Sequence, residues 1–163
     1  MNTDGLYKKI EIVKNDFNMM IPEGFKPMSE AVAQMKYPAQ NRPQIILTND
    51  TATVDYKFAY IQEIVDMTVL EELIKQTKIS LKRVFTGIEY YKEDIIEIND
   101  TKFGWFDYKS PAIGGNMYNV SFFTWIKGKL LQGTFTCEFV NAEEWRESFL
   151  YSIMSIEEEK ANE

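Results

Sequence analysis

Short turns separate strand-like segments through most of this sequence. Three of the turns are marked by an Asn-Asp pair, at Asn15-Asp16, Asn49-Asp50 and Asn99-Asp100. Asn and Asp tolerate the left-handed backbone conformation that tight hairpin turns require. On either side of these turns, apolar and polar residues alternate with the period of a strand that buries one face. Strands joined in this way pair antiparallel, because a parallel connection needs a dozen or more residues.

Eight segments are predicted to be strands. They cover residues 6–13, 17–21, 44–48, 51–60, 89–98, 101–108, 117–126 and 130–140. The stretch 111–115 contains a proline and two glycines, and it is predicted to be a flexible loop. The alternation is clean in 51–60, where Val54, Tyr56, Phe58 and Tyr60 face one way and Thr53, Asp55 and Lys57 face the other.

Three helices are predicted between and after these strands. Ser29 can cap a short helix over 30–36, with Met35 and either Val32 or Ala31 turned inward. A long helix is predicted from about residue 66 to residue 85, because apolar residues recur there at helical spacing. Its inward positions are Leu70, Leu73, Ile74, Thr77, Leu81 and Val84. The last helix follows Asn141 and precedes a polar tail, 157–163, and its apolar face comprises Ala142, Trp145, Phe149, Ile153 and Ile156.

This order of elements predicts an α+β fold. We expect a largely antiparallel β-sheet of about six to eight strands flanked by helices, in an α/β/α sandwich. The 163 residues fit a single domain, 1–163, since a domain usually has roughly 100–200 residues. Apolar residues make up 45% of the chain, which is enough to fill a core between these layers.

Proline is concentrated in one part of the chain, where four of the five prolines fall between Pro22 and Pro43. The order there is strand, turn, short helix, proline-bounded connection, strand. The segments with a familiar pattern are Phe17-Asn-Met-Met-Ile-Pro-Glu-Gly-Phe25, Met28-Ser-Glu30, Tyr37-Pro38, Arg42-Pro43, Gly133-Thr-Phe-Thr-Cys137 and, in the last helix, Trp145. In this order and pattern the chain resembles the PsbP-like fold superfamily, which includes the photosystem subunit PsbP, the Ran-binding Mog protein and bacterial DcrB-like proteins.

The resemblance implies a scaffold that binds proteins. It favours a non-enzymatic protein-interaction module, such as a cytoplasmic adaptor or a DcrB-like chaperone for a secreted effector. The expected partner is another protein, and a second copy of the chain is one candidate. Two alternatives stay open: a small-molecule-binding domain with a pocket between the sheet and the long helix, or an enzyme that uses only carboxylates.

The inventory of side chains excludes several kinds of chemistry. The chain has no histidine, so it cannot form a Ser–His or Cys–His nucleophile pair. Its only cysteine, Cys137, cannot form an intramolecular disulfide or a thiolate zinc site, and it is predicted to fill the core. We therefore expect no catalytic residue, no metal site and no cofactor.

Charge and hydropathy bear on the partners that the chain can have. The net charge of −7 repels a phosphate backbone, which disfavours nucleic acid as a partner. The first residues lack the apolar core of a signal peptide, and no later stretch is apolar enough to span a membrane. These features predict a cytoplasmic protein that is not inserted in a membrane.

Five residues are candidates for partner binding. Tyr37 and Arg42 lie in the proline-bounded connection, where they either anchor a partner or belong to a stiffened, solvated loop. Strand 130–140 has a polar face of Gln132, Thr134, Thr136 and Glu138, opposite Leu131, Phe135, Cys137 and Phe139. The strands that contain Trp105, Phe123 and Trp125 have aromatic residues on both faces. We expect either a helix of the same chain or a partner to cover these aromatic side chains.

Overall fold

The computed structural model describes residues 6–38, 42–64 and 69–160 of the chain. Over these residues it contains three α-helices and ten strands, which confirms the predicted α+β class. The helices are α1 (Glu30–Lys36), α2 (Leu70–Val84) and α3 (Ala142–Met154). The strands are β1 (Tyr7–Val13), β2 (Phe17–Pro22), β3 (Lys26–Pro27), β4 (Ile45–Thr48), β5 (Asp55–Ile64), β6 (Glu89–Ile98), β7 (Thr101–Ala112), β8 (Gly115–Ile126), β9 (Lys129–Glu138) and β10 (Glu157–Glu158).

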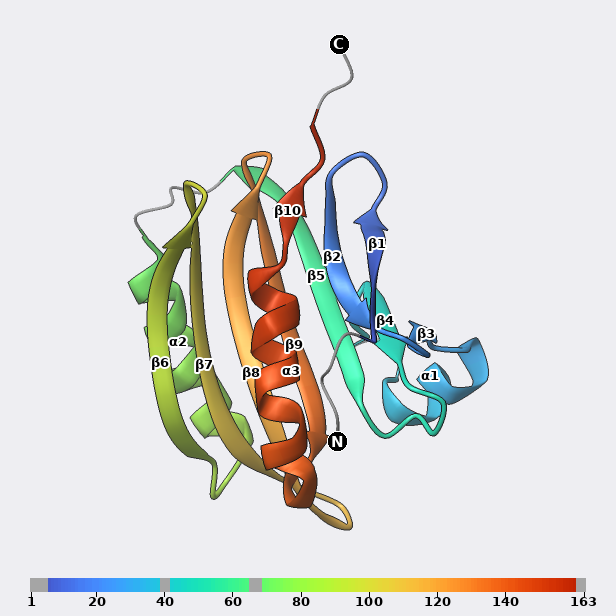
Figure 1. Cartoon of the computed structure of the whole chain (residues 1–163). Coiled ribbons are helices and arrows are strands. Elements are labelled where there is room, and N and C mark those ends of the chain that lie inside the picture. The colour runs from blue at the N-terminus through green and yellow to red at the C-terminus, as the bar shows by residue number, and fades with distance from the viewer. Residues whose placement is uncertain (1–5, 39–41, 65–68, 161–163) are drawn as a thin grey trace.

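Seven of these strands form one antiparallel sheet, in the order β3-β4-β5-β9-β8-β7-β6. The other three, β1, β2 and β10, form a small sheet of their own. Figure 1 shows α3 and the β1–β2 hairpin on one face of the large sheet and α2 on the opposite face. The large sheet therefore has the predicted number of strands and helices on both faces, and its two faces are covered by different elements.

Hairpin turns form where the sequence places Asn-Asp pairs and glycine. Asn99 and Asp100 have φ values of 50° and 66°, as a two-residue turn between twisted strands requires. The predicted loop over 111–115 is shorter in the structure, where residues 113–114 form a turn, because β7 and β8 continue as a paired hairpin to Ala112 and Gly115. Pro111 is tolerated there because it lies beyond the end of β6 in the register, where β7 has a strand on only one side.

Several predicted boundaries differ from the structure. β5 begins at Asp55 instead of residue 51, because the Asn49 side chain accepts hydrogen bonds from the backbone N–H groups of Thr53 and Val54 and holds a loop. β9 ends at Glu138, and residues 139–141 form a short 3₁₀ turn. No strand was predicted in the polar tail, but β10 within it pairs with β2. β10 and β3 are two residues long, too short to show an alternation in the sequence.

The helices form at the predicted places, with local differences. Ser29 caps α1 by accepting from the N–H of Val32, but Ala33 faces inward and Met35 is 84% exposed. A helix of two turns has too few apolar residues to fix which face is buried. The predicted start of the long helix, 66–68, lies outside the described residues. At its other end Val84 is 71% exposed, which contradicts its predicted inward position.

The main core lies between the large sheet, α3 and the β1–β2 hairpin. It contains the predicted inward residues of β5 and β9, and the predicted face of α3 packs against it. Phe149 and Ile153 of α3 are completely buried, and Trp145 is partly buried against Phe25. A smaller core lies under α2, where Leu70 and Ile74 are buried against β7 and β8. Both cores are apolar and rich in aromatic residues.

A buried carboxylate fixes α3 to the sheet. Asp107 of β7 is only 2% exposed. One of its oxygens accepts from the Tyr118 hydroxyl at 2.7 Å and from Arg146 Nε of α3 at 3.1 Å. The other accepts from the backbone N–H of Lys92 at 2.8 Å, at the bulge where β6 shifts register. A buried charge of this kind is tolerated because it is paired and hydrogen-bonded, and here it connects a helix and two strands.

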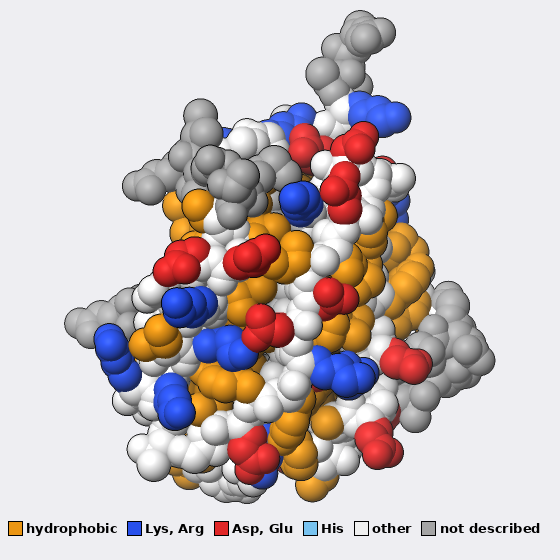
Figure 2. Space-filling model, turned by 90° about the vertical axis from the view of Figure 1, so that its left-hand side faces the viewer, with side chains coloured by type: hydrophobic (Ala, Val, Ile, Leu, Met, Phe, Trp, Pro, Cys, Tyr) orange, Lys and Arg blue, Asp and Glu red, His pale blue; other side chains and the backbone are white. Residues whose placement is uncertain are grey.

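Charged side chains protect the outer strand, β6, from pairing with another chain. Acidic and basic side chains are interspersed on the side of the molecule that carries β6 and α2 (Figure 2). Lys78 of α2 pairs with Glu93 of β6 at 2.5 Å. Edge strands commonly carry such charges, which oppose edge-to-edge association. Among the basic residues of α2, Lys78 thus faces an acid of the neighbouring strand.

A glycine in β9 makes room for the main core. A Cβ atom on Gly133 would lie 2.5 Å from Cε1 of Phe122 and 2.7 Å from the backbone oxygen of Lys57. We expect Gly133→Ala to lower the free energy of unfolding by about 1–3 kcal/mol, as overpacking of a core does. Gly104→Ala is the matched control, because its Cβ would meet the flexible end of Ile74 at 3.0 Å. Urea unfolding of both variants checks this, and equal losses would contradict it.

Cys137 is buried in the main core, as the alternation in β9 predicts. Burial raises the pKa of its thiol to about 12. We therefore expect a thiol reagent to modify Cys137 slowly in the native protein and rapidly in denaturant, since the thiolate is the reactive form. The rate of labelling followed by mass spectrometry measures this. Similar rates in both conditions would show that the strand is exposed in solution.

Candidate functional site

The five predicted partner-binding residues do not form one surface. Trp105 lies in the main core, and Phe123 and Trp125 lie in the core under α2. They are 6%, 3% and 3% exposed, so other residues of the same chain cover them. Cover by the same chain was one of the two predicted alternatives. Tyr37 and Arg42, in contrast, are only partly buried.

Tyr37 and Arg42 are held in place by neighbouring elements. The Tyr37 hydroxyl donates to Asp55 of β5 at 2.5 Å, and Asp55 also accepts from Lys36 at 2.6 Å. Burial, and then the nearby Asp55 charge, raise the pKa of Tyr37. Arg42 Nη1 donates to both carboxylate oxygens of Glu30 at 2.9 Å, which lowers the pKa of that carboxyl. The connection between α1 and β4 is thus fixed at both of its described ends.

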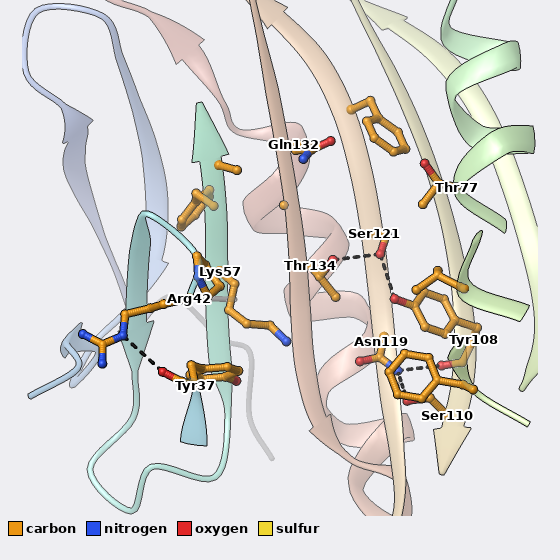
Figure 3. Close-up of a pocket in the computed structure, with 17 residues that line it drawn as sticks. Tyr37, Arg42, Lys57, Thr77, Tyr108, Ser110, Asn119, Ser121, Gln132 and Thr134 are labelled. Carbon is orange, nitrogen blue, oxygen red and sulfur yellow. Dashed lines mark hydrogen bonds between the residues drawn. The ribbon is translucent and has the colours of Figure 1, made fainter. Parts of the chain in front are cut away.

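These residues form one rim of a groove on the α2 face of the large sheet. The groove has a volume of about 610 Å³ and is open to solvent. Tyr37, Arg42 and Pro43 form one rim, and α2 forms the other with Thr77, Leu81 and the following Phe85. The strands β5, β9, β8 and β7 form the floor between them (Figure 3). The groove exists because α2 covers β7 and β8 and leaves the strands next to them bare.

The floor of the groove is a network of polar side chains. The Tyr108 hydroxyl lies 3.0 Å from Ser121 Oγ, which lies 2.9 Å from Thr134 Oγ1. Asn119 donates to Ser110 Oγ at 3.0 Å and accepts from Thr136 at 2.9 Å. These residues come from three neighbouring strands, so the polar row runs across the sheet. Figure 3 shows the row between the two rims.

One cation extends into the groove. Lys57 of β5 lies opposite Thr134 of β9 in the register, and its Nζ lies 5.3 Å from the centre of the Tyr37 ring. Burial lowers the pKa of Lys57 to about 8, and nearby Lys36 acts in the same direction, whereas Asp55 opposes the shift. The amine points into the cavity, toward the strands that carry Thr134 and Asn119 (Figure 3).

Carboxylates are absent from the described residues that line the groove. The two most buried acids, Asp55 and Asp107, accept hydrogen bonds from other parts of the fold, and neither lines it. No group of three or more potential metal ligands occurs among the described residues. The same residues contain no helix that is long and apolar enough to cross a membrane.

Solved structures of other proteins share this architecture. No family model matches the chain, and no curated protein matches its sequence. Cyanobacterial PsbP from Synechocystis is 10% identical and has a TM-score of 0.70, with 97% of this chain and 96% of that chain covered. The chain has the PsbP-like fold.

Two further structures share this fold. The Ran-binding protein Mog1p of Saccharomyces cerevisiae is 10% identical, with a TM-score of 0.61 and 93% and 94% of the two chains covered. LpqN of Mycobacterium tuberculosis, which is involved in cell envelope biogenesis, is 8% identical, with a TM-score of 0.62 and 94% and 91% covered. The predicted resemblance to PsbP-like proteins is thereby confirmed at the level of the fold.

Sequence reasoning found part of the groove. Tyr37, Arg42 and Phe123 were named as partner-binding candidates, and all three line it. The polar face of β9 was also predicted correctly. Asn119 and Ser121 were missed, although the alternation in β8 puts them on the same side as Phe123. Lys57 was placed on a polar face but was not singled out, because the sequence does not show which strand lies next to β5.

The buried charge of Lys57 makes stability depend on pH. Below about pH 8 the amine is charged in both the folded and the unfolded state, and its desolvation destabilises the folded state. Between about 8 and 10.5, the ordinary pKa, the folded protein loses this proton while the unfolded chain keeps it, so stability rises with pH. We expect Lys57→Met to be more stable than the parent below pH 8 and to lose this advantage by pH 10.5.

Urea unfolding at a series of pH values measures this difference. Lys82→Met is the matched control, since Lys82 is exposed on α2. A stability difference between parent and Lys57→Met that stays constant from pH 7 to pH 10.5 would contradict the lowered pKa of Lys57.

Proposed function

We propose that this chain is a non-enzymatic protein-interaction module that binds an extended segment of a partner protein in the groove. The observation that carries the proposal is the open polar floor between α2 and the rim of Tyr37, Arg42 and Pro43. The groove is open to solvent along β5 and β9, where Lys57, Gln132 and Thr134 are only partly buried. Its hydroxyl and amide groups can both donate and accept hydrogen bonds, as a peptide backbone requires.

The rim supports binding by side chains of the partner. Leu81 and Phe85 on one side and Tyr37 on the other provide apolar and aromatic contacts on both sides of the polar floor. Tyr37 is held by Asp55, so its ring is positioned before a partner arrives. A preformed rim reduces the entropy that binding costs.

A non-enzymatic role agrees with the residues of the groove. The chain contains no histidine, and the described residues that line the groove include no carboxylate. The groove therefore lacks the side chains that most often act as general acid or base. Mog1p, which has the same fold, is a Ran-binding protein, and this likeness supports a protein partner for the present chain.

A small molecule is the second candidate for the groove. Its volume of about 610 Å³ lies within the range of ligand pockets, roughly 300–1,000 Å³. We favour a peptide segment because the groove is open to solvent, whereas small-molecule sites enclose most of their ligand. A cytoplasmic location, a DcrB-like chaperone role for a secreted effector, and a second copy of the chain as partner stay predictions.

Selection from a library of short random peptides tests the proposal. Ala59 of β5 lines the groove, so Ala59→Trp should place an indole in the space that the segment would occupy. We expect the parent protein to select peptides whose affinity for Ala59→Trp is at least about tenfold lower, which is about 1.4 kcal/mol. Fluorescence anisotropy of the selected peptides gives both affinities.

Ala31→Trp is the matched control, because Ala31 is exposed on α1 and does not line the groove. It should bind the selected peptides as the parent does. If Ala59→Trp binds them equally well, the groove is not the binding site. If the parent selects no peptide at all, the proposed function is wrong.

A further inference from the structure

Among the residues that the structure describes, Lys57 is a cation without an acidic partner in the groove. Among the described residues, no ion pair or hydrogen bond reaches its Nζ, which has a cation–π contact with the Tyr37 ring. Asp55 lies two residues earlier on the same face of β5, but its oxygens accept from Lys36, Tyr37 and Thr48. Five other lysines pair with carboxylates among the described residues, as Lys78 does with Glu93. Lys57 has no such pair there, although its side chain is partly buried in the groove.

The charge of the groove is opposite to that of the whole protein. The chain carries a net charge of −7, whereas the described residues that line the groove include Lys57 and Arg42 and no acid. The Arg42 guanidinium is already paired with Glu30, outside the groove lining. One positive charge is thus left for a ligand, and it is partly removed from water. A desolvated ammonium group favours an anion as its neighbour.

The hydroxyl groups beside Lys57 have one proton that can be donated in a hydrogen bond to such an anion. Tyr108, Ser121 and Thr134 each supply one hydroxyl donor, and two hydrogen bonds join the three of them. One of the three protons is not used within this chain of hydroxyls. When Tyr108 donates to Ser121 and Ser121 to Thr134, the free proton is on Thr134, directly opposite Lys57 in the register. An anion at Lys57 would favour that direction.

We propose that the groove selects partner segments with an acidic side chain, whose carboxylate pairs with Lys57 Nζ and accepts a hydrogen bond from Thr134. This inference rests on the proposed function and specifies the chemistry that the groove recognises. One free positive charge matches the single negative charge of a carboxylate. A phosphate dianion would need a second cation, and the surrounding negative charge of the protein would repel it.

The side chain of Asp or Glu is a better match than the carboxylate of a chain end. The groove is open to solvent, so a segment can lie across its floor and continue beyond it. The apolar and aromatic groups of both rims then contact the residues on either side of the acid. The charged and titratable groups that face Lys57 are Asp55 on its own strand, and Lys36 and Tyr37 from α1 and its C-terminal end.

Titration of the whole chain with N-acetylglutamic acid α-amide, followed by NMR, tests the inference. Its neutral isostere N-acetylglutamine amide, N-acetylalanine and inorganic phosphate are the other probes. We expect the glutamate probe to raise the pKa of Lys57 from about 8 and to shift the backbone signals of Lys57 and Thr134. The glutamine probe should do neither, and binding should weaken as the pH rises above the pKa of the bound amine.

Lys57→Gln should bind the glutamate probe at least about tenfold more weakly than the parent. Lys82→Gln removes the same charge from an exposed site on α2 and should bind like the parent. Equal effects of the glutamate and glutamine probes on the pKa of Lys57 would overturn the inference, and this readout needs no variant. Stronger binding of N-acetylalanine or phosphate would overturn the assignment to an acidic side chain.

The two proposals can fail separately. If selected peptides bind in the groove but replacement of each Glu by Gln and each Asp by Asn leaves their affinity unchanged, the carboxylate inference is wrong and the proposed function stands. If no peptide is selected, the proposed function fails, and the glutamate titration alone then decides whether Lys57 binds a carboxylate.

Discussion

One helix cannot cover one face of a seven-stranded sheet. With a strand spacing of about 4.8 Å, seven strands extend over about 29 Å, whereas a helix with its side chains is about 10–12 Å wide. On one face α3 shares the cover with the β1–β2 hairpin, and the main core fills the space. On the other face α2 packs against β7 and β8, and the strands beyond it stay open. The groove is a consequence of this mismatch in width.

The floor of the groove beside α2 contains polar side chains that bond to one another. The row from Tyr108 through Ser121 to Thr134 satisfies hydroxyl groups that would otherwise face a half-buried surface. Lys57 lies at the end of this row, and among the described residues it has no equivalent partner. The groove is thus a surface whose polar groups are mostly paired, with a single charged group left over, and this is the arrangement on which the proposed recognition depends.

Buried carboxylates hold the elements on either side of this surface. Asp55 fixes the end of α1 through Lys36 and Tyr37, and so positions one rim of the groove. Asp107 fixes α3 and the bulge of β6 on the opposite face of the sheet. Each is buried and accepts several hydrogen bonds, which compensates for the loss of hydration. Both acids therefore have structural roles, and neither is among the described residues that line the groove.

The sequence by itself determined the features that depend on neighbours along the chain. The alternation in β5, β8 and β9 predicted which side chains share a face, including the aromatic residues on both faces of β7 and β8. The Asn-Asp turns predicted hairpins, and the spacing in the last helix predicted the buried face of α3. These patterns are local, because a strand repeats every two residues and a helix every 3.6.

Only the tertiary structure decided which strands became neighbours. β5 pairs with β9, more than 60 residues later in the chain, and this pairing puts Lys57 opposite Thr134. No local pattern specifies such a pairing, since any strand with a buried face could occupy that place. The same holds for β3 and β10, for the position of α2 over β7 and β8, and for the acid-free groove beside it. These features arise from the packing of distant segments, so the site was visible in the sequence as separate residues and as a site only in the fold.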